Sequence, residues 1–196
     1  MSIRERNAIA GLGLCVLVAL VTVVVTVDIG LDLAEVEVGV GPAGAKTVPT
    51  GEPAPSFSLE DLDGDQISLA DQRGKVVLVD FWATWCGPCL QELPHIQQLH
   101  EEYRERGLVV LAISTDSQKE KVLPFVDKEG YTFPVLYADS QVQAAYGVRG
   151  IPAVYLIDRQ GMMRFQTVGF GPGGEEKLIE EVEKLLQESD QVSAKI

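Results

Sequence analysis

One apolar strand that leads directly into a pair of cysteines constrains this chain more than any other feature. Residues 76–81 are apolar at nearly every position, as in parallel strands that helices cover on both faces. Cys86 and Cys89 follow, just before a segment in which apolar residues have helical spacing. The sequence therefore predicts an α/β domain with two thiols at a strand-to-helix junction.

The position of the first thiol at the start of a helix would make it reactive. Unpaired backbone N–H groups and the positive end of the helix dipole stabilise a thiolate there. Gly87 and Pro88 provide the tight geometry in which Cys89 can reach Cys86. We predict that Cys86 is the nucleophile and that Cys89 is the resolving thiol.

A zinc site is the other common use of two cysteines at this spacing, and it needs two further ligands. The sequence offers only Cys15, inside a distant apolar run, and His95 and His100 on the following helix. We therefore expect no metal and no cofactor. The net charge of −13 at pH 7 also repels phosphate groups and argues against a nucleic-acid partner.

An apolar run near the N-terminus predicts a membrane anchor. Residues 8–27 carry no charge, and twenty helical residues cross a hydrocarbon core of about 30 Å. Arg4 and Arg6 precede the run and acidic residues follow it, which predicts a cytoplasmic N-terminus and a domain outside the cytoplasmic membrane. A cleaved signal peptide would have a shorter run and a small-residue site. A lipoprotein signal at Cys15 would need a small residue where Leu14 stands.

The chain then divides into five predicted parts. They are a cytoplasmic N-terminus at 1–7, a single-pass transmembrane anchor at 8–27, a flexible linker rich in Gly and Pro at 28–52, a folded domain at 53–190 and a tail at 191–196. Within the domain we expect an N-terminal hairpin, strands at 76–81, 108–114, 133–137, 153–158 and 162–168, and helices after Cys86, from a capping box at Ser117, at 141–146 and at 175–187.

The motif Val-Asp-Phe-Trp-Ala-x-Trp-Cys-Gly-Pro-Cys at residues 79–89 is similar to the active-site signature of the thioredoxin superfamily. With the hairpin and a helix-strand insertion between residues 116 and 146, the chain resembles the membrane-anchored TlpA/ResA family over residues 53–190. The resemblance implies a thioredoxin-like three-layer α/β/α sandwich with an N-terminal β-hairpin extension and a central insertion. It also implies a thiol–disulfide oxidoreductase outside the cytoplasmic membrane.

The same resemblance assigns a substrate-binding role to residues outside the cysteine motif. Pro152, preceded by Ile151, matches the cis-proline that lies beside the disulfide and binds the extended substrate backbone. Trp85 resembles the exposed tryptophan of the thioredoxin docking surface. Ala153 departs from the glutamate or threonine that some cytochrome-maturation members carry, which leaves specificity through that contact open.

Two carboxylates are candidates to accept the proton that Cys89 loses when it resolves a mixed disulfide. Asp80, in an otherwise apolar strand, matches the buried aspartate of thioredoxins, and its alternative role is structural. Glu92, one helical turn after Cys89, matches the active-site glutamate of ResA-type proteins, and its alternative is a solvated helix position. Burial would raise the pKa of either carboxyl.

The Gly-Pro dipeptide between the cysteines resembles that of thioredoxin, whose potential is about −270 mV against about −120 mV for a DsbA-type oxidant. We therefore expect a reductant of client disulfides, for example in apocytochrome c or in a copper-site assembly protein. Because extracytoplasmic space is oxidising, a transmembrane thiol donor of the CcdA or DsbD type is expected to supply electrons.

Two other functions stay open on the sequence. The Ala-Pro-Ser-Phe opening at residues 54–57 also fits a peroxiredoxin-like peroxidase, although Ala83 stands where a peroxidatic site needs threonine. A non-catalytic binding or chaperone module with a thioredoxin fold is disfavoured because both cysteines are present.

Overall fold

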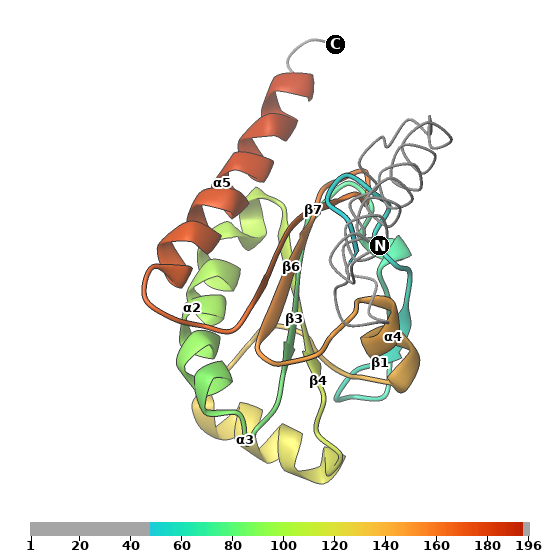
Figure 1. Cartoon of the computed structure of the whole chain (residues 1–196), viewed down its shortest axis with the longest axis vertical. Coiled ribbons are helices and arrows are strands. Elements are labelled where there is room, and N and C mark those ends of the chain that lie inside the picture. Colours follow the sequence, from blue (N-terminus) through green and yellow to red (C-terminus); the bar gives the residue numbers. More distant parts are fainter. Residues whose placement is uncertain (1–47, 194–196) are drawn as a thin grey trace, which may run out of the picture. The chain divides into compact units, whose positions relative to one another are not determined.

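The fold is known from a computed structural model that describes residues 48–193, with side chains up to residue 188. Five strands form one sheet in the order β5-β4-β3-β6-β7 (Figure 1). The strands are β3 (Val76–Trp82), β4 (Leu108–Ser114), β5 (Val135–Tyr137), β6 (Ala153–Ile157) and β7 (Met163–Val168). The strand that carries the cysteines, β3, therefore lies at the centre of the sheet.

The apolar character of β3 follows from its central position. Every residue of β3 is buried, and the strand pairs in parallel with β4 and antiparallel with β6. The predicted strand at 76–81 is confirmed and is one residue longer. The strands predicted at 153–158 and 162–168 form an antiparallel hairpin, β6 and β7, with Gly161 at φ 78° in its turn, a conformation that glycine adopts without strain.

Helices cover both faces of the sheet and complete the predicted three layers (Figure 1). Leu78 and Trp82 belong to the cluster shared with α2 (Gly87–Tyr103), α3 (Val122–Glu129) and α5 (Gly174–Ser193). Val79 and Phe81 belong to the cluster on the other face, with α4 (Ser140–Ala145) and the hairpin of β1 (Ser58–Glu60) and β2 (Gln66–Ser68). The alternation along β3 thus sends even-numbered side chains toward α2.

Helix α2 begins at the cysteines, as predicted, and a short 3-10 turn leads from it to Gly107 at φ 98°. Pro94 lies inside the helix. The helical spacing of apolar residues predicts Leu90 in the core, together with Leu93 and Ile96, but Leu90 is exposed whereas Glu92 is buried. The buried stripe runs through Cys89, Glu92 and Leu93, so a carboxylate occupies a core position that a hydrophobicity pattern assigns to leucine.

The predicted capping box at Ser117 does not form. A 3-10 turn at Lys119–Lys121 comes first, and α3 begins at Val122 without a side-chain cap. A helix that began at Ser117 would hold Pro124 in its interior, where proline removes a hydrogen bond and clashes with the preceding turn. Starting at Val122 places Pro124 in the first turn, where its missing N–H costs nothing. The helix ends at Gly130, which has φ 75°, a conformation that favours glycine at a helix end.

Other boundaries differ by a few residues. Strand β5 begins at Val135, whereas 133 was predicted, and α4 begins at Ser140, where the Asp139 side chain accepts a hydrogen bond from the Val142 N–H at 2.7 Å. Helix α5 continues to Ser193, past the predicted end at 187.

The last residues of the range predicted as linker, 48–52, lie against the domain. Val48 is buried, and the Gly51 N–H donates a hydrogen bond to the Met163 carbonyl at 2.7 Å. The predicted cytoplasmic segment, the anchor at 8–27 and the rest of the linker, with Arg4, Arg6 and Cys15, lie outside the described residues. In the part of the chain that is described, no helix has the length and hydrophobicity to span a bilayer.

Candidate active site

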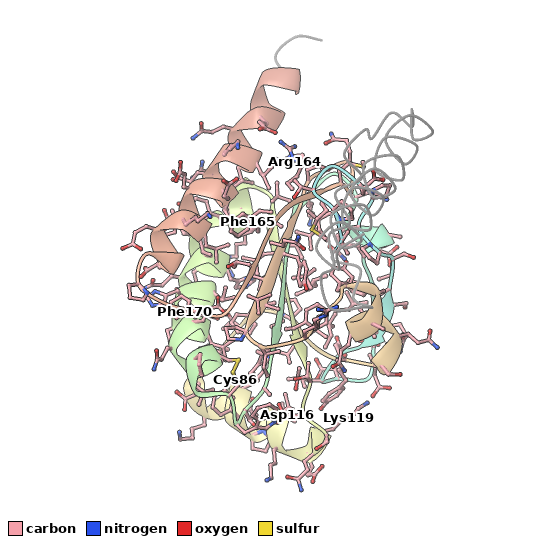
Figure 2. All side chains as sticks on the ribbon, viewed as in Figure 1. Cys86, Asp116, Lys119, Arg164, Phe165 and Phe170 are labelled. Carbon is pink, nitrogen blue, oxygen red and sulfur yellow. A yellow bond between two sulfur atoms is a disulfide. The ribbon has the colours of Figure 1, made fainter. Side chains whose placement is uncertain are left out.

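The two cysteines form a disulfide between the loop after β3 and the first turn of α2, seen as a yellow bond at Cys86 in Figure 2. Their Cα atoms are 5.3 Å apart. Cys86 is 5% exposed, whereas Cys89 is completely buried. Of the two cysteines, Cys86 is therefore the one that another protein can approach.

The start of α2 favours negative charge on Cys86. This residue caps the helix, and its sulfur accepts the Cys89 backbone N–H at 3.3 Å. After reduction of the disulfide, the same donor and the positive end of the 17-residue helix would stabilise a thiolate on Cys86. The geometry thus favours Cys86 as the nucleophile and the shielded Cys89 as the resolving thiol.

A cis-proline segment lies on one side of Cys86 and a tryptophan lies in the loop just before it. The Ile151–Pro152 peptide bond is cis, and the Ile151 carbonyl oxygen is 3.7 Å from the Cys86 sulfur. A hydrogen bond of 2.8 Å from the Gly169 N–H to the Pro152 carbonyl ties this segment to the end of β7. Trp85 is 70% exposed. Of the residues predicted to bind substrate, Ile151 thus contacts the Cys86 sulfur and precedes Pro152, whereas Trp85, Gly87 and Pro88 are exposed next to Cys86 in the sequence.

Both candidate carboxylates are buried in the layer between β3 and α2. Asp80 has an exposed fraction of 0% and Glu92 of 2%. On the neighbouring strands Asp80 pairs with Ala112 and Val154, both apolar and buried. Among the described residues, neither oxygen of Asp80 has a hydrogen-bond partner, and the Oε2 of Glu92 also lacks one. The solvated alternative for Glu92 is therefore wrong, and the chain holds two buried carboxyls behind its disulfide.

Burial makes both groups weak acids. It raises the pKa of Asp80 to about 7, and burial together with the charge of Asp80 raises the pKa of Glu92 to about 9. Because the two groups repel each other as carboxylates, they lose their protons one after the other, as a pair. Near neutral pH the pair can therefore hold one proton and accept another.

This proton affinity predicts how stability depends on pH. The pKa of Glu92 in the folded protein exceeds its ordinary value of 4.5, so the folded state holds a proton that the unfolded chain releases. The stabilisation that comes from this proton is fully present below pH 4.5. It falls, by up to about 1.4 kcal/mol per pH unit, as the pH rises toward the pKa of Glu92 in the folded protein. We expect Glu92→Gln to flatten this slope and to unfold at higher urea than wild type at pH 8.

Urea unfolding of the oxidised protein at pH 5 and pH 8 measures the effect. The exposed Glu105 provides a matched control, because Glu105→Gln should leave the slope unchanged. Parallel pH profiles for wild type and Glu92→Gln would contradict the burial of a protonated Glu92.

A residue that sequence reasoning missed positions the loop of the nucleophile. The Asp116 carboxylate accepts hydrogen bonds from the Thr84 N–H at 2.9 Å and the Thr84 hydroxyl at 2.6 Å. It also accepts one from the Ser114 hydroxyl at 2.9 Å. Figure 2 shows Asp116 at the same end of the molecule as Cys86. Asp116 therefore fastens the turn before Cys86 to the end of β4.

Loss of this anchor should destabilise the domain measurably. Hydrogen bonds to a charged group contribute about 1.5–3 kcal/mol each at most, so we expect Asp116→Ala to lower the free energy of unfolding by about 2 kcal/mol. Asp116→Asn, which keeps one acceptor oxygen, should lose less. Equilibrium urea unfolding of wild type, Asp116→Asn and Asp116→Ala tests this order of stability. Equal stability of all three proteins would contradict the anchoring role of Asp116.

The two histidines of α2 make contacts away from the cysteine pair. The His95 Nδ1 is 2.9 Å from a Glu175 carboxylate oxygen, and the His100 ring packs edge-on against Phe133. Both lie further along α2 than the cysteine pair.

Comparison with known proteins places the chain among thiol–disulfide oxidoreductases. The family model described as AhpC/TSA matches residues 50–166. The chain is 40% identical over 121 residues to the thioredoxin-like protein YneN of Bacillus subtilis, across 61% of this chain and 71% of YneN. It is 37% identical over 139 residues to the thiol-disulfide oxidoreductase ResA of Halalkalibacterium halodurans, across 70% of this chain and 77% of that ResA.

Solved structures agree on the fold. A thiol:disulfide interchange protein of the thioredoxin family from Chlorobium tepidum has a TM-score of 0.63 at 31% identity, covering 74% of this chain and 99% of that one. The thioredoxin domain of a thiol-disulfide oxidoreductase from Bacteroides vulgatus has a TM-score of 0.63 at 26% identity, and the match covers 69% of this chain and 99% of that domain. The predicted thioredoxin-like α/β fold is thereby confirmed. The chain belongs to the AhpC/TSA family and is a thioredoxin-like thiol–disulfide oxidoreductase of the ResA type.

Proposed function

We propose that this protein is a membrane-anchored reductant of disulfides in client proteins outside the cytoplasmic membrane. One observation supports it above the others: the accessible Cys86 sulfur lies beside the cis-Pro152 segment, with Cys89 buried behind it. Such a site bonds to one sulfur of a client while its second thiol stays shielded until it is needed.

The cycle starts from the dithiol form. The Cys86 thiolate attacks a client disulfide, and the other client sulfur leaves as a thiolate. Cys89 then gives its proton to the pair of Asp80 and Glu92 and attacks the Cys86 sulfur. The second client thiolate departs, and the Cys86–Cys89 disulfide forms. Two electrons have moved from the cysteine pair to the client.

The reducing direction is inferred from the Gly87-Pro88 dipeptide, which resembles that of thioredoxin. A reductant in an oxidising compartment needs resupply, so we assign the electrons to a transmembrane thiol protein of the CcdA or DsbD type. Apocytochrome c, whose haem attachment needs free thiols, and copper-site assembly proteins are client classes that fit this chemistry.

A single-turnover assay tests the activity. Full-length protein, reduced and freed of reductant, is mixed with a disulfide-bonded peptide. We expect one peptide disulfide to open for each Cys86–Cys89 disulfide that forms. Consumption of hydrogen peroxide with the peptide left intact would instead indicate the peroxidase alternative. Suppression of client aggregation by a variant lacking both cysteines, without any thiol exchange by the wild type, would indicate a chaperone.

A separate experiment tests the proposed position of the domain outside the cytoplasmic membrane. The charge-free run at 8–27 and its flanking charges motivate an anchor with the domain outside. Protease added to intact spheroplasts should then degrade the domain, while a cytoplasmic marker protein stays intact. Full protection of the domain until the cells are lysed would refute the proposed topology.

A further inference from the structure

A groove runs along the seam between α2 and the start of α5, on the same side of the sheet as the disulfide. Phe170, in the loop that follows β7, lies in its middle and divides it into two hollows. Figure 2 shows Phe170 beside α2, on the side where Cys86 lies. The buried Leu99 and Leu178 and the half-buried Ile179 line one hollow. Its floor is therefore apolar.

Contacts from both helices hold Phe170 in this position. Its ring centroid lies 5.5 Å from that of His95 on α2, with 32° between the ring planes. A Cβ atom on Gly174, at the first residue of α5, would lie 3.6 Å from the Phe170 ring, so the backbone passes close to it. His95 in turn contacts Glu175 at 2.9 Å. The ring is thus a fixed, half-exposed wall of the groove.

The rim of the groove carries charge of one sign. Glu102, Glu175 and Glu176 line the two hollows, and among the described residues no lysine or arginine lines either of them. Lys177 follows directly in the sequence, but its ammonium lies over the Phe165 ring at 5.4 Å. The lining therefore combines carboxylates with an aromatic ring and an aliphatic floor.

Long basic side chains match this combination. Their methylene groups pack on apolar surface while the charged end stays at the rim, and the cation is attracted both by carboxylates and by an aromatic face. An acidic side chain would be repelled by these carboxylates, and a short apolar one would gain nothing from them.

The groove also lies within reach of a client bonded to Cys86. Gln91 and His95, which line it, follow Cys86 by five and nine residues, or about 7.5 and 13.5 Å along the helix axis. An extended client chain advances about 3.3 Å per residue. A side chain three to five positions from the client cysteine therefore spans the distance.

We propose that this groove receives a lysine or arginine side chain of the client, three to five residues from the cysteine that Cys86 attacks. The inference rests on the proposed function and adds a substrate preference to it. Client segments with a basic residue at that spacing react faster than neutral ones, and acidic ones react more slowly.

Three disulfide-bonded peptides that differ at one position test this preference. The position, four residues from the attacked cysteine, holds lysine, norleucine or glutamate. Single-turnover reduction by the full-length protein is followed at low and high salt. We expect the lysine peptide to react roughly fivefold faster than the norleucine peptide at low salt, and the difference to shrink at high salt.

Matched variants separate the groove from the overall negative charge of the protein. Glu175→Gln with Glu176→Gln should abolish the lysine preference and leave the norleucine rate unchanged. Asp127→Asn with Glu180→Gln removes two exposed carboxylates that do not line the groove and should keep the preference. Equal rates for the three peptides would overturn the proposal, and so would a preference that survives in the groove variant. Failure to reduce even the norleucine peptide would instead contradict the proposed reductase activity.

Discussion

Replacing Cys89 by alanine should trap this protein on its clients. Cys86 lies at the positive end of α2 and is the accessible sulfur, so attack on a client disulfide proceeds without Cys89. The mixed disulfide then has no internal thiol to resolve it. We expect Cys89→Ala to accumulate covalent complexes that non-reducing gels show and dithiothreitol releases, with multiple turnover reduced at least about 1,000-fold.

Two controls accompany the trap. Cys86→Ala should form almost no complexes, because the remaining Cys89 is fully buried. Both variants are made with Cys15→Ala, so that no third thiol contributes, and Cys15→Ala alone should behave as wild type. Complexes on Cys86→Ala and none on Cys89→Ala would reverse the assigned roles. Mass spectrometry of the trapped partners identifies the client.

Removing both buried carboxyls should produce the second large effect. Asp80 and Glu92 are the groups placed to accept the Cys89 proton, and general base catalysis contributes about 10²–10⁴-fold. We expect Asp80→Asn and Glu92→Gln each to slow resolution of the mixed disulfide about tenfold, since the other carboxyl remains, and the double variant to slow it by several hundredfold.

Rapid acid quenching of the reaction with a disulfide peptide separates the two steps. The first attack, by a Cys86 thiolate already present, should keep its rate in all three variants. In wild type, resolution should accelerate as the pH rises through the first ionisation of the pair, since the pKa of Asp80 is about 7. A double variant no slower than one single variant would show that only one carboxyl works. Equal slowing of both steps would show that the carboxyls act on structure.

The sequence predicted those parts of the site that are local or tied to a motif. The strand at 76–81 is apolar because both faces are covered, and the cysteines and Pro152 lie at fixed places relative to strands that the apolar runs mark. The burial of Asp80 could be predicted because its neighbours along the chain are apolar. Glu92 could be placed only through the resemblance, since its neighbours in the sequence are polar as well as apolar.

The remaining features depend on contacts between distant segments. Asp116 stabilises Thr84 across 32 residues, and only the parallel pairing of β3 with β4 brings the two strand ends together. The Phe170 groove joins α2 to α5, which no local pattern predicts. The capping box at Ser117, by contrast, fails for a local reason. Pro124 lies in the same segment of the sequence, and its effect on a helix outweighs the capping preference of Ser117.

The reduction potential of the Cys86–Cys89 pair tests the central claim most directly, because a reductant and an oxidant can share this fold. Full-length protein carrying Cys15→Ala is equilibrated with thiol–disulfide buffers of known potential, and the free thiols are labelled and counted. We predict a midpoint close to that of thioredoxin, about −270 mV. A midpoint close to that of DsbA, about −120 mV, would contradict the account and identify an oxidant of client thiols.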